Sequence, residues 1–448
     1  MTAVTLERRL ANFRAAVSVG PRIEVEAAER RERSSLAAAE RLVATVGGEI
    51  VRGRGGAFVR LESSAVALPV DREALARLPF QPTPDRPLLC LDTETTGLAT
   101  AAGTIAFLVG LGWWEADRFR TVQLLLPDHA DEAALLAELA SVVPGEGWLV
   151  TYNGRGFDWP LLTTRFRMHR HDAPGHAGHL DLLPLVRRIY RHRLPDARLR
   201  TVETHLLGVQ RHHDVEGWEI PGRYFDVLRG GPAELLVDVL RHNAEDVRSL
   251  ARLVSLMATG LGDRAAWDRA PAGDLAGLGR AYRVAGRPEM ALACLDVALA
   301  ADGRPAEPTP SAGHVAREEA AWWLGPADLP WGLRPAARPW ADRAGDSWTE
   351  QRLLVERAHI LRRLGRHDEA AESWVAVAAG PGRLAPLGWL EVAKLRERRL
   401  GDLPGALAAT ERARIAVDKR RRLRLPEPRL EAAIDVRLAR LRRRLRVA

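Results

Sequence analysis

The sequence predicts two folded parts: an α/β domain with a mixed central sheet flanked by helices, and an all-α domain of paired helices after it. At 448 residues the chain exceeds the size at which a single hydrophobic core keeps growing. Between about residues 88 and 257, short apolar runs alternate with segments of helical spacing, and from about 272 the pattern is wholly helical. We expect an extension and linker over 1–84, the α/β domain over 85–257 and the helical domain over 272–448.

The N-terminal segment begins with two arginine-rich helical patterns, "LERRLANFRAAV" and "EAAERRERSSLAAAERLVATV". Helicity is then interrupted by Gly47, Gly48, Gly53, Gly55 and Gly56. The stretch "GAFVRLES" is typical of a short strand, and the proline-rich "LPFQPTPDRP" leads into the α/β domain.

The α/β domain opens with three predicted strands, "LLCLDTE", "TIAFLVGLGWWE" and "FRTVQLLLP". A helix is predicted at "DEAALLAELASVV", whose first turn is acidic as the helix dipole favours, and a strand at "GWLVTYN". Later helices are predicted at "DLLPLVRRIYRHR" and "PAELLVDVLRHNAEDVRSLARLVSLM". Consecutive strands followed by alternating helix and strand predict a mixed sheet with an antiparallel half.

The C-terminal domain contains a repeated unit in which a glycine closes one helix and a small alanine follows five residues later. The glycines and alanines are Gly286 with Ala291, Gly365 with Ala370, and Gly401 with Ala406. The spacing of 36 residues between the last two glycines resembles the tetratricopeptide (TPR) repeat of about 34 residues. A generic helical bundle is the alternative. A TPR-like stack would form a concave groove for a protein or peptide partner.

The composition permits a polyanionic partner, since 66 basic residues against 58 acidic ones leave a net charge of +8. Nearly all the basic residues are arginine, however, because Lys394 and Lys419 are the lysines of the chain. Arginine-rich solvated faces explain the charge equally well.

The two cysteines, Cys90 and Cys294, lie in apolar segments and are expected to be free thiols of a reducing compartment. The N-terminus lacks the apolar core of a signal peptide, and no stretch reaches the roughly 18 apolar residues of a membrane span. We expect a cytoplasmic protein without a membrane partner.

Acidic residues follow buried segments at three places. In "LLCLDTETTG", Asp92 and Glu94 share one face of a strand while Thr93 points away. Such a pair is often solvated, but here apolar residues flank it, and two buried carboxylates repel each other. A positive group is therefore expected between them.

The other two places complete the acidic set. In "VTYNGRGFDWPLL", glycines permit a tight turn after a strand, and Asp158 opens the following helix near the sheet edge. In "LRHNAEDVRSL", His242 and Asp246 stand at i and i+4 and share a helix face.

Together these motifs, Asp92-x-Glu94, Asn153-x3-Phe157-Asp158 and His242-x3-Asp246, resemble the three motifs of the DEDD 3′–5′ exonucleases in the ribonuclease H-like superfamily. The closer resemblance is to the YprB-type ribonuclease H-like domain, which also accounts for "HLDLLPLVRRIYRHRLPDARLRTVETHLLG" and "EIPGRYFDVLRGG". It covers about residues 85–257. The resemblance implies a ribonuclease H-like fold for this domain.

The resemblance also implies that Asp92, Glu94, Asp158 and Asp246 hold two divalent ions, Mg²⁺ or Mn²⁺. Asp92 would bridge both ions, Glu94 and Asp246 would bind the ion on the nucleophile side, and Asp158 would act on the other. His242 would orient or deprotonate the attacking water. The known subclasses place a His five residues, or a Tyr four residues, before the last Asp. A packing role for His242 is therefore the alternative.

Weaker candidates surround this set. The candidates for nucleic-acid contacts are Thr95, Thr96, Gly97, Asn153 and Phe157, of which the first three can equally form a turn. Asp181 either borders the cleft or caps a helix. The histidines of "MHRHDAPGHAGH" form either a zinc site or, more in keeping with the absence of cysteine, a polar surface loop.

The resulting hypothesis is a metal-dependent nuclease, most simply a 3′–5′ exonuclease that hydrolyses phosphodiester bonds of RNA or DNA. The alternatives are a structure-selective endonuclease with the same acids, and a non-catalytic platform that holds nucleic acid and recruits partners through its repeats.

Overall fold

The computed structural model describes residues 29–53, 55–79, 82–97, 103–211, 214–300, 350–380 and 384–447. These residues belong to two compact units. The first comprises the described residues up to Pro184 together with Arg198–Thr259, and the second comprises Leu185–Ala197 together with the described residues from Gly260. The helix expected at 6–17 and the Trp- and Pro-rich stretch at 320–340 lie outside the described residues.

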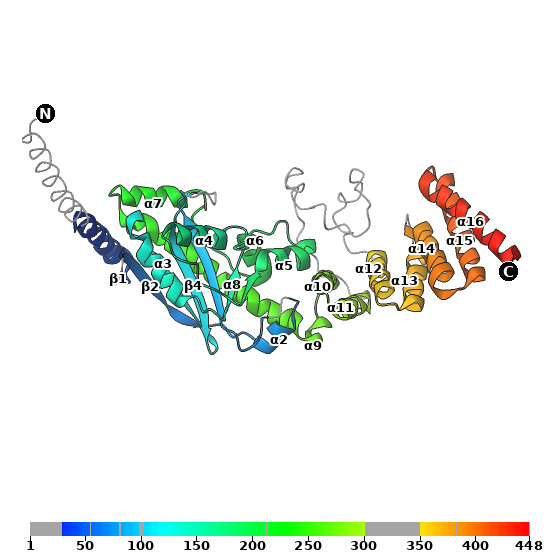
Figure 1. Ribbon diagram of the computed structural model, residues 1–448, viewed down its shortest axis with the longest axis horizontal. Helices are drawn as coiled ribbons and strands as arrows, with labels where there is room; N and C mark the ends of the chain where they lie inside the picture. Colours follow the sequence, from blue (N-terminus) through cyan, green and yellow to red (C-terminus); the bar gives the residue numbers. More distant parts are fainter. Residues whose placement is uncertain are drawn as a thin grey trace, which may run out of the picture. The chain divides into compact units, whose positions relative to one another are not determined.

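The first unit is built on a mixed seven-stranded sheet in the order β1-β2-β5-β4-β3-β6-β7. Strands β1, β2 and β4 of this sheet are labelled in Figure 1. The strands are β1 (Glu49–Gly53), β2 (Gly56–Ala67), β3 (Leu88–Thr95), β4 (Ala106–Glu115), β5 (Arg118–Leu125), β6 (Trp148–Thr151) and β7 (Gly178–Asp181). The pairs β1–β2, β2–β5, β5–β4 and β4–β3 are antiparallel, whereas the pairs β3–β6 and β6–β7 are parallel. The predicted mixed sheet with an antiparallel half is confirmed.

Strands β1 and β2 come from the segment expected as an extension before residue 85, yet they complete this sheet. A helix over residues 29–46 precedes them, and Gly47 and Gly48 adopt φ of +79° and +88° between it and β1. These left-handed conformations suit glycine and let the chain turn sharply into the hairpin. The glycines that mark the end of helicity therefore introduce a strand rather than a linker.

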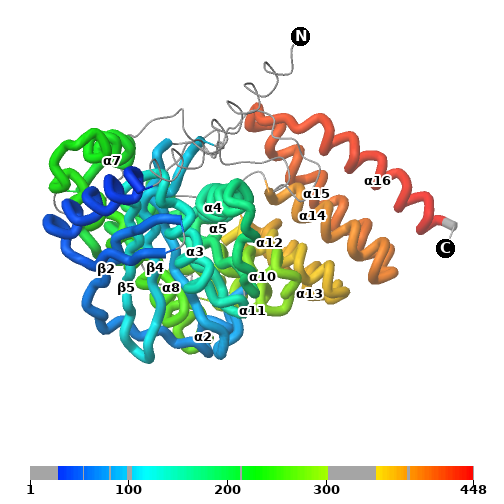
Figure 2. The backbone as a smooth tube through the Cα atoms, turned by 60° about the vertical axis from the view of Figure 1, so that its left-hand side comes forward, coloured from blue at the N-terminus to red at the C-terminus, as the bar shows by residue number. Residues whose placement is uncertain are grey.

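Helices cover both faces of the sheet. The helices of this unit are α2 (Arg72–Arg77), α3 (Glu132–Val142), α4 (Asp158–Met168), the start of α5 (Leu182–Ile189), α6 (Leu199–Val202), α7 (Ile220–Leu228) and α8 (Val237–Met257). Gln123 of β5 donates a hydrogen bond to α8. The next residue of β5 lies opposite Arg60 of β2, and Arg60 forms an ion pair with Glu138 of α3. Because neighbouring strand residues face opposite ways, α8 and α3 lie on opposite faces (Figure 2).

The second unit is helical. Its helices are α9 (Arg264–Trp267), α10 (Ala272–Val284), α11 (Pro288–Ala300), α12 (Glu350–Arg363), α13 (His367–Ala379), α14 (Leu384–Leu395), α15 (Leu403–Arg422) and α16 (Pro428–Val447). Consecutive helices pack as α10 with α11, α12 with α13, and α14 with α15. The alanines named above are each 0% exposed, and Gly286, Gly365 and Gly401 have φ of +73°, +77° and +70°. The predicted all-α character is confirmed.

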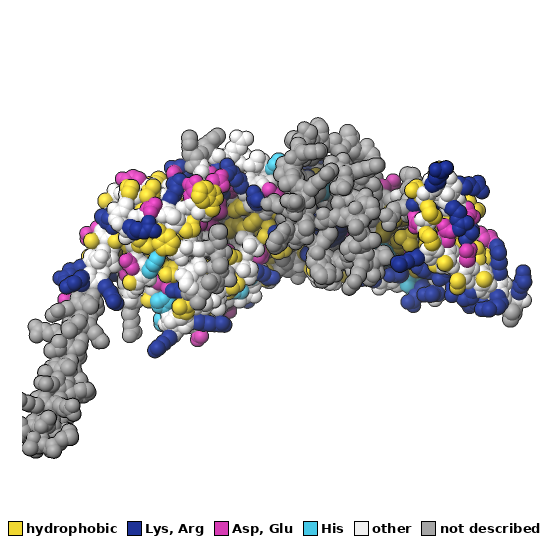
Figure 3. Space-filling view, turned by 90° about the horizontal axis from the view of Figure 1, so that it is seen from above, with side chains coloured by type: hydrophobic (Ala, Val, Ile, Leu, Met, Phe, Trp, Pro, Cys, Tyr) yellow, Lys and Arg dark blue, Asp and Glu magenta, His cyan; other side chains and the backbone are white. Residues whose placement is uncertain are grey.

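Arginines gather over α16 at the end of this unit (Figure 3). Several of them are paired, because Arg437, Arg440 and Arg444 all contact Glu397. Within the described ranges, every helix is too short or too polar to cross a bilayer.

Residues 185–197 follow the sheet in sequence but pack with the helical unit. A Cβ at Gly277 of α10 would lie 2.4 Å from the carbonyl oxygen of Arg188, so the two backbones are in close contact. Arg193 also donates to Asp274 of α10 at 2.7 Å. The helix expected at 181–193 ends as α5 at Ile189 and takes part in both units.

Candidate active site

Three elements bring the acidic residues together. Strand β3 carries Asp92 and Glu94, α4 begins at Asp158, and α8 carries His242 and Asp246. The elements are linked by direct hydrogen bonds. Asn243 of α8 donates from Nδ2 to Asp92 Oδ2 at 2.9 Å, and Thr93 donates from Oγ1 to Asp158 Oδ1 at 2.6 Å.

Helix α8 approaches the sheet closely because β4 presents glycines to it. A Cβ at Gly110 would lie 2.3 Å from Asn243 Oδ1, and one at Gly112 would lie 2.7 Å from Val247 Cγ1. Gln123 then donates to Asn243 Oδ1 at 2.8 Å. That bond orients the amide of Asn243 so that its nitrogen faces Asp92. Glycines at alternate positions of a strand, as at Gly110 and Gly112, indicate that another backbone approaches closely, and this signal in the sequence predicts that a helix packs here.

The carboxyl groups affect one another strongly. Burial raises the pKa of Asp92 well above its ordinary value, and the charges of Asp246, Asp158 and Glu94 raise it further. The pKa of Glu94 is raised in the same way, by burial and then by Asp246 and Asp158. Burial raises the pKa of Asp158 to about 6, although its bond from Thr93 opposes the shift. The charges of Asp246 and Asp158 thus act on both carboxyl groups of β3.

Arg211 places a positive charge beside this cluster, not between Asp92 and Glu94. Its guanidinium donates to Asp246 and to Glu203, and it lies 3.5 Å from Asp214. The side chain is 7% exposed, and Glu203 is fully buried. Burial alone lowers the pKa of Arg211, but the surrounding carboxylates outweigh it and the pKa is raised. Arg211 is therefore a fixed charge beside the cluster.

His242 faces the carboxylates. Its Nδ1 lies 2.7 Å from Asp214 Oδ1, while its Nε2 lies 3.9 Å from Glu94 Oε1 and 3.7 Å from Asp246 Oδ2. Arg211 is also near Nδ1, at 3.2 Å, but the shorter contact to Asp214 requires a proton on Nδ1. Nε2 is then the basic nitrogen, and it points at the cluster.

Asp214 is suited to this orienting role. Burial by itself raises its pKa, but the hydrogen bond and charge of His242 and the charge of Arg211 outweigh that effect and the pKa is lowered. Asp214 thus stays an acceptor for the Nδ1–H of His242. It was not among the candidates from sequence.

The donor chemistry fits hard divalent ions, because three carboxyl groups with raised pKa gain from a nearby cation. Among the described residues, however, no group of three or more His, Cys, Asp and Glu side chains is arranged to hold a metal ion. Oxygens of Asp92, Asp158 and Asp246 are instead aimed at Asn243, Thr93 and Arg211. Ion binding would require these side chains to turn toward a common point.

Most of the weaker candidates form hydrogen bonds with backbone groups of nearby residues. Thr95 donates to the carbonyl of Gly97 at 2.7 Å, and Thr96 accepts from the N–H of Ile105 at 3.0 Å, so both hydroxyls are used within the turn. Phe157 is half-buried at the start of α4, where its N–H donates to the carbonyl of Asn153 at 3.2 Å.

Asn153 is exposed with φ of +69°, and its N–H donates to Asp181 at 2.8 Å. Asp181 also accepts from the N–H of Leu183 at 3.2 Å. This carboxylate therefore holds the turn after β6 and caps the start of α5.

The four clustered histidines do not form one site. His169 lies 2.8 Å from Glu132, whereas His176 and His179 line a cavity beside α4, and His171 is exposed. This separation removes the zinc interpretation of the segment.

Comparison with known proteins agrees with the fold. A family model described as RNase_H superfamily matches residues 89–258. A protein of Bacillus subtilis (strain 168), named uncharacterized protein YprB, is 41% identical over 168 residues. The alignment covers 37% of this chain and 40% of that protein. The similarity to the RNase H superfamily model lies in residues 89–258, and the similarity to the Bacillus subtilis protein spans less than half of either chain.

Proposed function

From this RNase H superfamily domain we propose that the chain is a metal-dependent nuclease, and specifically a 3′–5′ exonuclease acting on RNA or DNA. The observation that carries the proposal is the convergence of four acids and His242. Asp92, Glu94 and Asp158 have raised pKa values, and His242 Nε2 lies 3.9 Å from Glu94 and 3.7 Å from Asp246. Strongly perturbed pKa values cluster at functional sites.

Each residue has a role that its contacts support. Asp92, Glu94, Asp158 and Asp246 would hold divalent ions. When bound, these ions would supply a water of lowered pKa and neutralise charge at the scissile phosphate. His242 Nε2, 3.9 Å from Glu94, accepts the proton of the attacking water while Asp214 holds the ring in place.

The test uses Asp92→Ala and Asp158→Asn in Mg²⁺ or Mn²⁺ with end-labelled strands. Both changes are expected to abolish nucleotide release while thermal unfolding stays cooperative. The matched control is Asp172→Asn, which removes an exposed carboxylate from the loop after α4. If both site variants cleave as fast as the parent chain, the assignment is wrong.

The same assay identifies the preferred nucleic acid and distinguishes exonuclease from endonuclease cleavage. A panel of single- and double-stranded RNA and DNA identifies the preferred substrate, because contacts to the 2′-hydroxyl separate the two nucleic acids. Circular single strands separate the modes, since an exonuclease needs an end. Cleavage of circles would replace the exonuclease by a structure-selective endonuclease with the same acids.

One observation favours a non-catalytic nucleic-acid platform. Arg211 already neutralises Asp246, so part of the charge that a metal ion would balance is met by the protein. Calorimetric titration with Mn²⁺ discriminates between the two functions. A nuclease is expected to bind the ion and to lose that binding in Asp92→Ala, whereas a platform would give no heat in either protein.

We further propose that the helical unit binds a protein or peptide partner in the manner of TPR repeats. The support is the stacking of paired helices around glycines of positive φ and fully buried alanines. Affinity capture with the full-length chain tests this proposal. Recovery of only nucleic acid would contradict it.

A further inference from the structure

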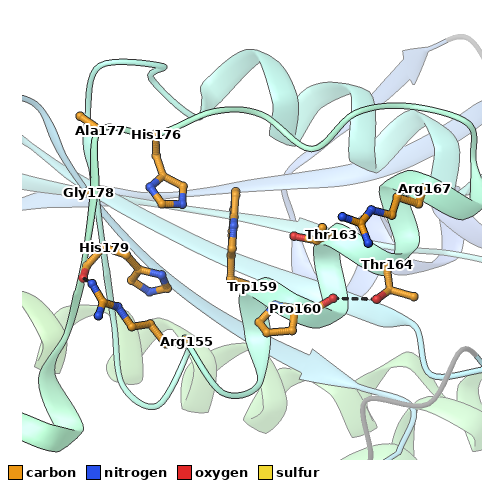
Figure 4. A pocket seen from close by; sticks show the side chains of 10 residues that line it. All are labelled: Arg155, Trp159, Pro160, Thr163, Thr164, Arg167, His176, Ala177, Gly178 and His179. Carbon is orange, nitrogen blue, oxygen red and sulfur yellow. Dashed lines mark hydrogen bonds between the residues drawn. The ribbon is translucent and has the colours of Figure 1, made fainter.

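A cavity of about 730 Å³ lies beside α4, outside the acid cluster. One wall is a face of α4 with Trp159, Thr163 and Arg167 at successive i, i+4 positions, and the other is the segment of His176 and His179 leading into β7 (Figure 4). Its size is that of ligand pockets in general. Trp159 directly follows Asp158, so the cavity adjoins the candidate active site along the chain.

The cavity is positively charged. Arg155 and Arg167 line it, and no carboxylate is among the described residues that line it. Arg155 is anchored by a hydrogen bond from its guanidinium to the carbonyl of His179. Arg167 is exposed, and no ion pair engages it within the described residues. Figure 4 shows the two guanidinium groups on opposite sides of Trp159. An exposed guanidinium without an acid in the cavity lining, such as that of Arg167, favours a phosphate or another anion.

The remaining walls are aromatic and hydrogen-bonding. In Figure 4 the indole of Trp159 stands between His176 and Thr163, and its ring centroid lies 5.1 Å from that of His176. Burial and then the charge of Arg155 lower the pKa of His179 to about 4, so its ring is neutral at physiological pH. An indole edge or face with neutral polar neighbours suits a nucleobase, which stacks and accepts hydrogen bonds at once.

We propose that this cavity binds one nucleotide of a single-stranded nucleic acid, with the base against Trp159 and a phosphate at Arg167. The proposal depends on the proposed function only in taking nucleic acid as the ligand. It requires no hydrolysis, because none of the acids of the cluster lines the cavity. The site would hold the strand beside Asp158 at the start of the same helix.

The experiment measures binding of short fluorescein-labelled single strands, RNA and DNA, to the full-length protein in EDTA. Trp159→Ala is expected to weaken binding about tenfold, and Trp159→Phe to restore most of it, because stacking on an aromatic ring is worth about 1–3 kcal/mol per base. Arg167→Gln is expected to lower the slope of log K against log salt by about 0.7, the value for one phosphate contact.

The matched control is Arg52→Gln. Arg52 is an exposed arginine of β1, the strand at the opposite edge of the sheet from β7, and its loss removes the same charge. It is expected to leave both the affinity and the salt slope unchanged. Trp159 also packs against the core, so thermal unfolding of Trp159→Ala is measured alongside, and Arg167→Gln carries the test should that variant unfold.

Photo-cross-linking supplies a readout that structural damage does not produce. Strands carrying 4-thiouridine or bromodeoxyuridine are expected to attach to the peptide that contains Trp159. Asp158→Asn should bind and cross-link normally even when it is inactive, which separates this proposal from the catalytic one. Equal affinity and salt slope in the parent, Trp159→Ala and Arg167→Gln would overturn the proposal, as would a parent chain that binds neither strand.

Discussion

Asp158 gives the clearest test at the scale of single residues, because its raised pKa links charge to stability. The unfolded chain releases this proton near pH 4, whereas the folded chain holds it to about pH 6. The folded state therefore loses stability as the pH rises through that window, and the loss is complete above it. At about 1.4 kcal/mol per pKa unit, the cost near neutral pH is about 3 kcal/mol.

We expect Asp158→Asn to be more stable than the parent toward urea at about pH 7.5 in EDTA, and the difference to vanish near pH 4. Divalent ions should stabilise the parent and not this variant. Asp172→Asn is again the control, because that carboxylate is exposed. An unchanged dependence of stability on pH in Asp158→Asn would contradict the assigned burial.

The orientation of His242 gives a second prediction. Asp214→Asn either places an amide donor against Nδ1, which moves the ring proton to Nε2, or leaves a weaker acceptor that orients the ring less firmly. We expect kcat to fall about 10²- to 10⁴-fold, the range for loss of a positioned general base, with KM little changed. In a His242→Ala background the same change should have no further effect. Independent, additive losses would show that Asp214 acts elsewhere.

Residue types were easier to predict than their partners. Strand alternation pairs Asp92 with Glu94, and helical i, i+4 spacing pairs His242 with Asp246. Asp158 was chosen because it follows a turn at the end of a strand, and the roles of all five residues stay predictions. Arg211 and Asp214 were not identified, since the contact of Asp214 with His242 spans 28 residues and that of Asn243 with Asp92 spans 151. No local pattern encodes contacts of this range.

At the scale of elements, the packing of α8 on β4 decides whether the two halves of the site meet. Gly110→Ala would put a methyl group 2.3 Å from Asn243 Oδ1 and 2.8 Å from Val247 Cγ2. We expect a loss of about 1–3 kcal/mol in the free energy of unfolding, typical of overpacking, and a lower kcat from displaced His242 and Asp246.

The control for this prediction is Gly222→Ala in α7. A Cβ there meets no atom within 4 Å, so the variant should be neutral or slightly stabilised, as alanine favours helix. Urea unfolding and initial rates distinguish the two variants. If Gly110→Ala behaves like Gly222→Ala, α8 does not pack against β4 as described.

Elements with strong periodicity were predicted well, and those set by long-range pairing were not. The strands β3, β4 and β5 and the helix α8 follow directly from apolar runs and helical spacing. Strand β1 was missed because it is short, follows Gly48 and ends at Gly53, and because its residues are half-buried or exposed. That segment is a strand because it pairs with β2, which in turn pairs with β5.

At the scale of the whole molecule, the helical unit depends on residues far from it in sequence. A fragment of residues 272–448 lacks Leu185–Ala197, whose backbone packs against Gly277. Without that segment Asp274, which is 2% exposed, loses its bond from Arg193. We expect the fragment to melt at a lower temperature than the corresponding transition of the full chain. Identical melting would mean that the segment contributes nothing.

The chain passes between its units at Pro184, Ala197 and Thr259, and this threading has a consequence for biosynthesis. A ribosome delivers the strand with Asp92 and Glu94 early, but His242 and Asp246 only after the excursion into the helical unit. The acidic cluster therefore lacks His242 and Asp246 until the ribosome has translated more than half of the chain. A single proteolytic nick can likewise not separate two whole units. A cut after Thr259 removes Leu185–Ala197 from the helical unit, and a cut after Pro184 divides the first unit.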